Sequence, residues 1–150
     1  LVLANHGRMA DLTVCGKNIG AELEQTKAAR ESDIGSCIVI LATDLPLDSR
    51  QLGRVAKRAS VGLARLGSFI GQGSGEVFLA FSTANSFDSR KKAATRQVTA
   101  FHEDKLDIAF RAAAECTEEA ILNCLLTAHT VTGQDGKTVY ALTDLWKPEP

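Results

Sequence analysis

Residues 35–42 constrain the fold of this 150-residue chain more than any other stretch. The run Cys37–Ala42 is apolar at every position and rich in aliphatic side chains. So short a run, apolar on both faces of a strand, is typical of a strand buried on both sides. The dipeptide Gly35–Ser36 comes directly before it, and residues 22–33 upstream are polar without a clear apolar stripe. We therefore expect an exposed tether that enters a central strand at Ser36.

The remaining pattern predicts helices and strands grouped in an α+β fold. A helix is expected from Asp48, which can cap it together with Gln51, to a stop at Gly67. The other expected elements, in chain order, are short strands at 1–6 and 11–15 with a turn at Gly7, a glycine-rich turn at 71–75, a strand at 76–82, a surface loop at 83–104 with the basic run Arg90-Lys91-Lys92, a long helix at 106–128, and a turn at 133–136 before a strand at 138–141. Such grouping favours a layered α+β sandwich over an alternating parallel fold.

The long helix carries a small-residue face suited to close packing on a sheet. The face comprises Ile108, Ala109, Ala112, Ala113, Cys116, Ala120 and Cys124. Cys116 and Cys124 are eight residues apart, so they share this face, and we interpret them as buried small hydrophobic residues rather than a disulfide. The chain has four cysteines, without a CxxC pair or a histidine at ligand spacing. No metal or cofactor is predicted, and free thiols favour a cytoplasmic location.

Charge and hydropathy argue against two classes of partner. The net charge is −1, which offers no general attraction to nucleic acid or to an anionic membrane. No apolar run approaches the ~20 residues that a membrane-spanning helix needs. The chain begins at Leu1 without Met or a secretory signal and reads like the middle of a strand, so we expect further residues upstream.

Ser36 is the first candidate for chemistry. Strand alternation puts Ser36, Ile38 and Ile40 on one face and Cys37 on the other. Attack of the Ser36 hydroxyl on the Gly35 carbonyl would cut the chain, and we expect Gly35 to permit a strained backbone there. Ser36 would then carry a nucleophile together with an α-amine of reference pKa about 7.7–8.0, a suitable general base. This is the logic of N-terminal-nucleophile hydrolases; the alternative is a strand-capping Gly-Ser pair without chemistry.

Ser74 and Glu76 form the second candidate cluster. They are two residues apart at a loop-to-strand junction, so both can project to one face, with Phe78 below them. A hydroxyl beside a carboxylate can orient the Ser36 amine and stabilise its protonated form. The alternative is a solvated turn, whereas a phosphate-binding loop is disfavoured because no lysine follows the glycines.

Asn5 is the third candidate, because a side-chain amide at a strand end can donate to a developing oxyanion. Its neighbour His6 suggests a Ser-His-Asp arrangement, but no local spacing ties an acid to it. We therefore interpret His6, His102 and His129 as surface or structural residues.

Taken together, these pieces resemble the DmpA-type aminopeptidases, a family of D-/L-aminopeptidases and β-peptidyl aminopeptidases. The resemblance spans most of the chain in the family's order, and the combination is specific although each piece alone is not. The matching stretches are 3–8, 35–44, 73–76, 80–85 and 117–123.

The resemblance implies a self-cleaving precursor with an αββα fold. Residues 1–35 would end the α chain and residues 36–150 would form the β chain, all within the C-terminal part of a single hydrolase domain. Ser36 would be the nucleophile, Ser74 and Glu76 its polar support, and Asn5 an oxyanion contact. Family residues that bind the free amine of the substrate, and a tyrosine at the oxyanion site, belong to an N-terminal region that this chain lacks. That region and further αβ units in a homo-oligomer are the expected protein partners.

The predicted function is an aminopeptidase that releases N-terminal residues from short peptides, amides or esters. Two alternatives stay open. One is an acyltransferase of the ornithine acetyltransferase type, which also uses a self-generated N-terminal nucleophile, usually threonine. The other is a remnant that folds or associates without catalysis.

Overall fold

A mixed three-stranded sheet lies at the centre of the computed structural model, which describes residues 1–23, 35–90 and 93–147. The order is β1 (Val2–Asn5), β4 (Ser36–Thr43), β5 (Gly75–Ser82), with β1 antiparallel and β5 parallel to β4. Most of the expected tether and two lysines of the basic run lie outside the described residues. The α+β class is confirmed, and the apolar run does form the central strand.

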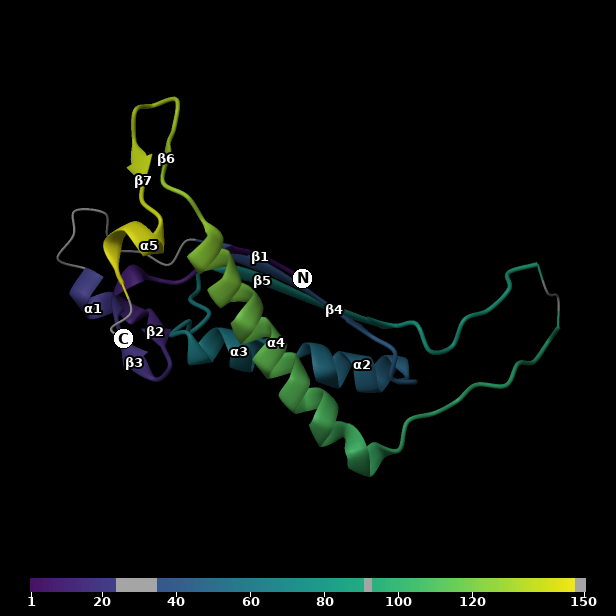
Figure 1. Cartoon of the computed structure of the whole chain (residues 1–150). Helices are drawn as coiled ribbons and strands as arrows, with labels where there is room; N and C mark the ends of the chain where they lie inside the picture. The colour runs from purple at the N-terminus through teal and green to yellow at the C-terminus, as the bar shows by residue number, and fades with distance from the viewer. Residues whose placement is uncertain (24–34, 91–92, 148–150) are drawn as a thin grey trace.

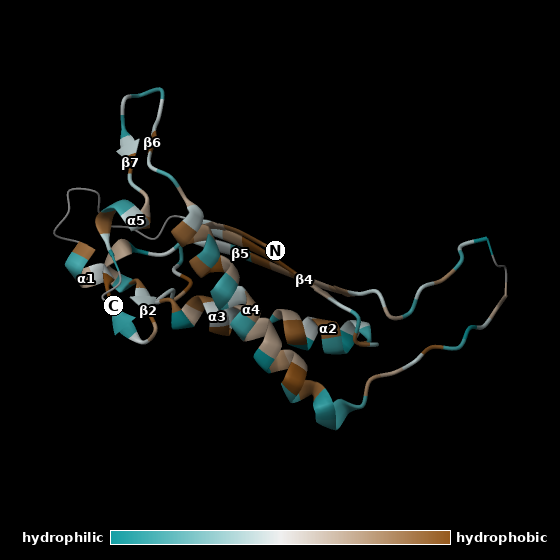
Figure 2. Cartoon of the chain, viewed as in Figure 1, coloured by the Kyte–Doolittle hydropathy of each residue, from teal (hydrophilic) through white to brown (hydrophobic). Residues whose placement is uncertain are grey.

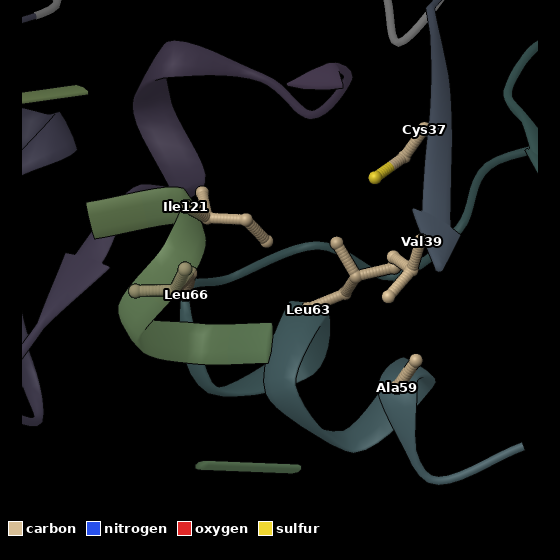
Figure 3. Close-up of a cluster of buried hydrophobic side chains, with 6 residues drawn as sticks. All are labelled: Cys37, Val39, Ala59, Leu63, Leu66 and Ile121. Atoms are coloured by element: carbon tan, nitrogen blue, oxygen red, sulfur yellow. The ribbon is translucent and has the colours of Figure 1, made fainter. Parts of the chain in front are cut away.

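Three helices pack on one face of the sheet (Figure 1). They are α2 (Ser49–Ala56), α3 (Ala59–Arg65) and α4 (Leu106–Thr127). Their main contact with β4 is a cluster in which Cys37 and Val39 meet Leu63 of α3 and Ile121 of α4 (Figure 3). Burial of this apolar face holds β4 in place, since removal of apolar surface from water is the main favourable term in folding.

The single helix expected from Asp48 to Gly67 is instead two helices. Its start is confirmed: the Asp48 carboxylate accepts from the Gln51 backbone, and the Gln51 side chain accepts from the Asp48 backbone. The break follows Ala56, where the Arg58 amide donates to Val55, three residues back, at 2.9 Å. This tighter turn redirects the chain. Buried apolar residues nevertheless continue from Val55 in α2 to Ala59 and Leu63 in α3. Gly67, with φ +94°, ends the segment as predicted.

The buried face of α4 differs from the expected one. Ile108 is 67% exposed, and Cys116 and Cys124 are exposed free thiols, so their predicted burial is wrong within this chain. The buried side chains are Leu106, Ala109, Ala113, Ala114, Thr117 and Ile121. The crossing with α3 selects this face: a Cβ on Gly62 would lie 2.5 Å from the Ala114 carbonyl oxygen, so α3 approaches α4 at that level.

The prediction that β4 is covered on both faces is also wrong for this chain. Cys37 and Val39 on its helix-facing side are buried, whereas Ser36, Ile38 and Ala42 on the other side are exposed. The open face continues onto both neighbours, where Leu3 is 69% and Leu79 is 54% exposed. Figure 2 shows much of the three strands in the brown of hydrophobic residues. A continuous apolar sheet face is thus left without a covering layer among the described residues.

Short elements complete the described chain. Of the strand expected at 11–15, only β2 (Thr13–Val14) is present, and the turn at Gly7 is confirmed by φ +80°. Residues 83–90 and 93–102, between β5 and η2 (Glu103–Lys105), are irregular, as expected, and extend away from the body (Figure 1). The remaining elements are η1 (Met9–Asp11), β3 (Lys17–Asn18), α1 (Gly20–Leu23), β6 (Val131–Thr132), β7 (Thr138–Val139) and α5 (Leu142–Leu145). None of the described helices has the length and apolarity that a membrane crossing requires.

Candidate active site

Asn5, Ser36 and Gly75 form one row across the sheet. Ser36 pairs with Asn5 in the antiparallel ladder and with Gly75 in the parallel ladder. All three are exposed and lie on the open face, whereas Cys37, the next residue of β4, is buried under the helices. The alternation predicted for Ser36 and Cys37 is therefore confirmed. The sheet brings the candidate nucleophile beside the candidate oxyanion donor.

Position 35 requires glycine because a Cβ would clash with β1, not because its backbone angles are unusual. Its φ lies outside the left-handed region, contrary to the strained backbone that we expected. A Cβ at this position would lie 1.9 Å from the Asn5 carbonyl oxygen and 2.8 Å from the His6 Cα. Only a residue without a side chain lets the Gly35–Ser36 peptide lie this close to β1.

The Gly35 carbonyl oxygen accepts two hydrogen bonds. The Ser36 hydroxyl donates to it at 2.7 Å, and the Gly75 amide donates at 3.1 Å. Gly75 also lies against the hydroxyl, because a Cβ built on it would be 3.5 Å from Ser36 Oγ. The candidate nucleophile, the carbonyl that it would attack and a backbone N–H thus lie together at the start of two neighbouring strands.

The Ser36 N–H points toward β1, the strand on the other side of β4 from β5. Leu1 and Ile40 exchange both backbone hydrogen bonds, at 2.9 and 3.0 Å. In an antiparallel ladder this type of pair recurs at every second residue, so Asn5 and Ser36 form a pair of the same type. The Ser36 N–H therefore points at the Asn5 carbonyl oxygen while the Gly35 C=O points at β5. The 35–36 peptide is held from both sides.

Ser74 and Glu76 contact each other as the local pattern predicts. The Ser74 hydroxyl donates to Glu76 Oε1 at 2.5 Å, and Glu76 Oε2 is buried without a hydrogen bond from the described residues. Glu76 pairs with Cys37 in the parallel ladder, so its side chain lies on the helix-covered face. Burial and the Glu76 charge raise the pKa of the Cys37 thiol to about 11. The carboxylate and the Ser36 hydroxyl therefore occupy opposite faces of the sheet, with the Ser36 nitrogen in the plane between them.

The histidines differ in their surroundings. His6 follows β1 and lines a cavity of about 310 Å³, together with Asn5, Leu66 and Tyr140 among others. His102 Nδ1 lies 3.7 Å from Asp104 Oδ2 on the surface, and His129 is exposed beyond the end of α4. Within the described ranges, no group of three or more His, Cys, Asp or Glu residues could hold a metal ion.

Sequence reasoning missed Gly75 and the contact between Cys37 and Glu76. Both depend on the register of β4 against β5, a parallel pair whose strands are separated by α2 and α3. Only the alternation within each strand was visible beforehand; it placed Ser36 away from Cys37 but could not say which residue lies opposite either one.

Comparisons with a family model and with known proteins point to the same family. The model of peptidase family S58 matches residues 1–139. The β-peptidyl aminopeptidase BapA of Sphingosinicella microcystinivorans is 40% identical over 156 residues, which cover 95% of this chain and 39% of that protein.

Two solved structures are similar to this chain in fold. The PH0078 protein of Pyrococcus horikoshii OT3 is 46% identical with a TM-score of 0.84, covering 94% of this chain and 38% of that one. The L-aminopeptidase D-Ala-esterase/amidase of Ochrobactrum anthropi, described as a prototype of the serine aminopeptidases and a new variant of the Ntn hydrolase fold, is 38% identical. Its TM-score is also 0.84, over 94% of this chain and 39% of that one. This chain thus spans about two fifths of the length of these relatives.

Proposed function

This chain belongs to peptidase family S58, and on that premise we propose that it is the nucleophile-bearing portion of an aminopeptidase that cleaves itself between Gly35 and Ser36. The substrates are short peptides, amides or esters with a free N-terminal amine. The single observation that carries the proposal is the 2.7 Å hydrogen bond between the Ser36 hydroxyl and the Gly35 carbonyl oxygen. It brings the proposed nucleophile against the Gly35–Ser36 bond, which the family resemblance expects to be cut.

Ser36 performs both halves of the chemistry after self-cleavage. Its Oγ attacks the substrate carbonyl while its free α-amine takes the hydroxyl proton and passes it to the leaving amine. Water then hydrolyses the acyl-enzyme ester and releases the acyl group. Asn5, paired with Ser36 across the ladder, donates its side-chain amide to the tetrahedral oxyanion.

Ser74 and Glu76 support the α-amine. In the uncut chain the Ser36 N–H points toward Asn5 of β1, so we propose that the α-amine freed by the cut turns toward the Glu76 carboxylate at the start of β5. Glu76 Oε2 is buried without a hydrogen bond from the described residues, and Ser74 holds the other carboxylate oxygen at 2.5 Å. A buried carboxylate oxygen in this state favours a cationic partner, and the protonated α-amine supplies one.

The open sheet face belongs under a second layer. Its apolar side chains Leu3, Ile38 and Leu79 are exposed in this chain, and the relatives are about two and a half times as long. We assign the covering sheet of an αββα sandwich, and the residues that bind the amine of the substrate, to the N-terminal portion of the α chain. Residues 36–150 then form the β chain, and αβ units associate further in a homo-oligomer.

Ser36→Ala in the full-length protein tests the proposal. We expect loss of both self-cleavage and turnover of amino-acid amides, because neither the attacking hydroxyl nor the new N-terminus forms. N-terminal sequencing of active wild-type protein should read Ser-Cys-Ile, and Ser60→Ala on α3 serves as a matched control that cleaves normally. Undiminished aminopeptidase activity in Ser36→Ala would refute the proposal.

The family match favours hydrolysis over acyl transfer. Incubating the full-length protein with an acyl donor, with and without an amine acceptor, separates the two by the product formed. A non-catalytic remnant predicts a single uncut species by intact mass, whereas the proposed enzyme gives fragments that end at Gly35 and begin at Ser36.

A further inference from the structure

We propose that the backbone N–H of Gly75 is the oxyanion donor of the self-cleavage step, distinct from the Asn5 side chain assigned to peptide turnover. The inference rests on the proposed function and adds to it the group that activates the scissile carbonyl. It starts from the two hydrogen bonds on the Gly35 carbonyl oxygen, from Ser36 Oγ at 2.7 Å and from the Gly75 nitrogen at 3.1 Å.

The direction of the scissile carbonyl selects the donor. The parallel ladder turns the Gly35 C=O toward β5, where the Gly75 amide meets it, and the antiparallel ladder turns the Ser36 N–H toward the Asn5 carbonyl. Each end of the scissile peptide is therefore bound by a different neighbouring strand. The register of β4 against β5 pairs Ser36 with Gly75, and it thereby determines which amide donates to the Gly35 carbonyl.

The reaction balances without a further cofactor. Oγ forms a bond to the Gly35 carbonyl carbon, and the π electrons move onto the oxygen that Gly75 already contacts. Collapse of this oxyanion breaks the Gly35–Ser36 C–N bond, and the hydroxyl proton ends on the Ser36 nitrogen. The products are an ester and a free α-amine; water then hydrolyses the ester to the Gly35 carboxylate and restores the hydroxyl.

The Gly75 bond strengthens as the reaction proceeds, because a hydrogen bond to a charged acceptor is shorter and roughly twice as strong as one to a neutral carbonyl. It is already aligned in the uncut chain, so no donor has to be reoriented at the moment of attack. The Ser36 hydroxyl, by contrast, must give up its own bond to this oxygen when it attacks. Gly75 is then the donor that remains.

Replacement of Gly75 by glycolic acid tests the role directly. This ester substitution removes the N–H and keeps the size and the glycine backbone, and it can be introduced into the full-length precursor by cell-free translation with a hydroxy-acid-charged suppressor tRNA. We expect self-cleavage, followed by gel from the end of translation, to slow by about 10²–10³-fold, the usual effect of losing one oxyanion donor.

The matched control is the same substitution at Gly133. Its amide donates to the Lys137 carbonyl at 2.8 Å in the β6–β7 hairpin, so the control also loses one backbone hydrogen bond, away from the sheet. We expect it to cleave at the wild-type rate. Wild-type cleavage by the Gly75 ester would overturn the inference and leave Ser36 as the nucleophile, whereas an uncut wild type would refute the proposed function itself.

Folding of the Gly75 ester is checked by protease resistance of the uncut precursor. If it is degraded, infrared spectroscopy of the Ser36→Ala precursor with a ¹³C=¹⁸O label at Gly35 decides, because that protein keeps the Gly75 amide and lacks the hydroxyl. A carbonyl frequency lowered by hydrogen bonding supports the inference. The frequency of an unbonded carbonyl overturns it.

Discussion

At the scale of single residues, the site depends on where side chains are missing as much as on where they are present. Gly35 brings the 35–36 peptide against β1, and Gly75 lies beside Ser36 Oγ and donates its N–H to the Gly35 carbonyl oxygen. Ser36 supplies the one side chain of this group, and its hydroxyl already contacts the peptide that we expect it to attack. The self-cleavage that we propose would therefore depend mainly on the arrangement of the backbone.

Gly35→Ala should disable this arrangement. A Cβ placed 1.9 Å from the Asn5 carbonyl oxygen forces the 35–36 peptide away from β1. We expect self-cleavage of the full-length protein to slow by about 10²-fold, since a displacement near 1 Å has that effect on positioned groups. Time-resolved gels measure it.

Gly53→Ala is the control for Gly35→Ala. A Cβ on Gly53 meets no atom within 4 Å, so this variant should cleave normally and gain about 0.5–1 kcal/mol of stability from its helical position. Wild-type cleavage by Gly35→Ala would show that the close approach to β1 is not needed.

At the scale of elements, one carboxylate links η2, which precedes α4, to α2 in the helix layer. Glu103 in η2 forms ion pairs with Arg50 and Arg54 of α2 and accepts from the Gln51 side chain at 3.0 Å. Hydrogen bonds from Arg50 and Gln51, with the charges of both arginines, lower the Glu103 pKa to about 2. These contacts fix the point at which α4 begins.

Glu103→Gln should change how stability depends on pH. A carboxylate whose pKa is depressed in the folded state stabilises the fold above its unfolded pKa, and this stabilisation is lost as the pH falls through the folded value. For Glu103 the window runs from about pH 4.5 down to about 2. Thermal melts of wild type and variant should therefore differ at pH 6 and converge toward pH 2.

Asp104→Asn, which removes an exposed neighbouring carboxylate, is the control and should melt close to wild type at both pH values. A Glu103→Gln curve parallel to wild type over the whole range would exclude the proposed tie between η2 and α2.

At the scale of the whole molecule, helices cover one face of the sheet, and no described residues cover the other. The helix layer closes over Cys37 and Val39, while Leu3, Ile38 and Leu79 remain open on the other side. The open side also carries the Ser36 hydroxyl. The covering layer that we propose would therefore also form the other wall of the proposed catalytic pocket.

Leu79→Asp should have opposite effects in the two contexts. In the 150-residue chain alone, Leu79 is 54% exposed, so the substitution should reduce binding of a hydrophobic dye and reduce aggregation in size-exclusion chromatography. In the full-length protein the same carboxylate would be buried between two sheets, and we expect loss of folded, self-cleaved product.

Val61→Asp on α3 gives the matched surface control, because Val61 is 43% exposed on the helix side of the molecule. It should leave the full-length protein folded and cleaved. Full-length Leu79→Asp that folds and cleaves like wild type would contradict the covering layer.

Local patterns in the sequence determined the elements and the alternation of their side chains. The capping pair at Asp48, the irregular segment after β5, the extent of α4, and the opposite directions of Ser36 and Cys37 all follow from interactions within a few residues. Such interactions depend on neighbours in the chain, so they can be read from its order.

Only the tertiary structure decided which faces are buried and which residues meet. The break between α2 and α3, the face of α4 that Gly62 selects, and the open side of β4 depend on how separate elements pack. The contact of Gly75 with the Gly35 carbonyl depends on the register of two parallel strands, which a short local pattern does not specify. The sequence predicted Ser36 as the nucleophile, and the sheet decided what lies against it.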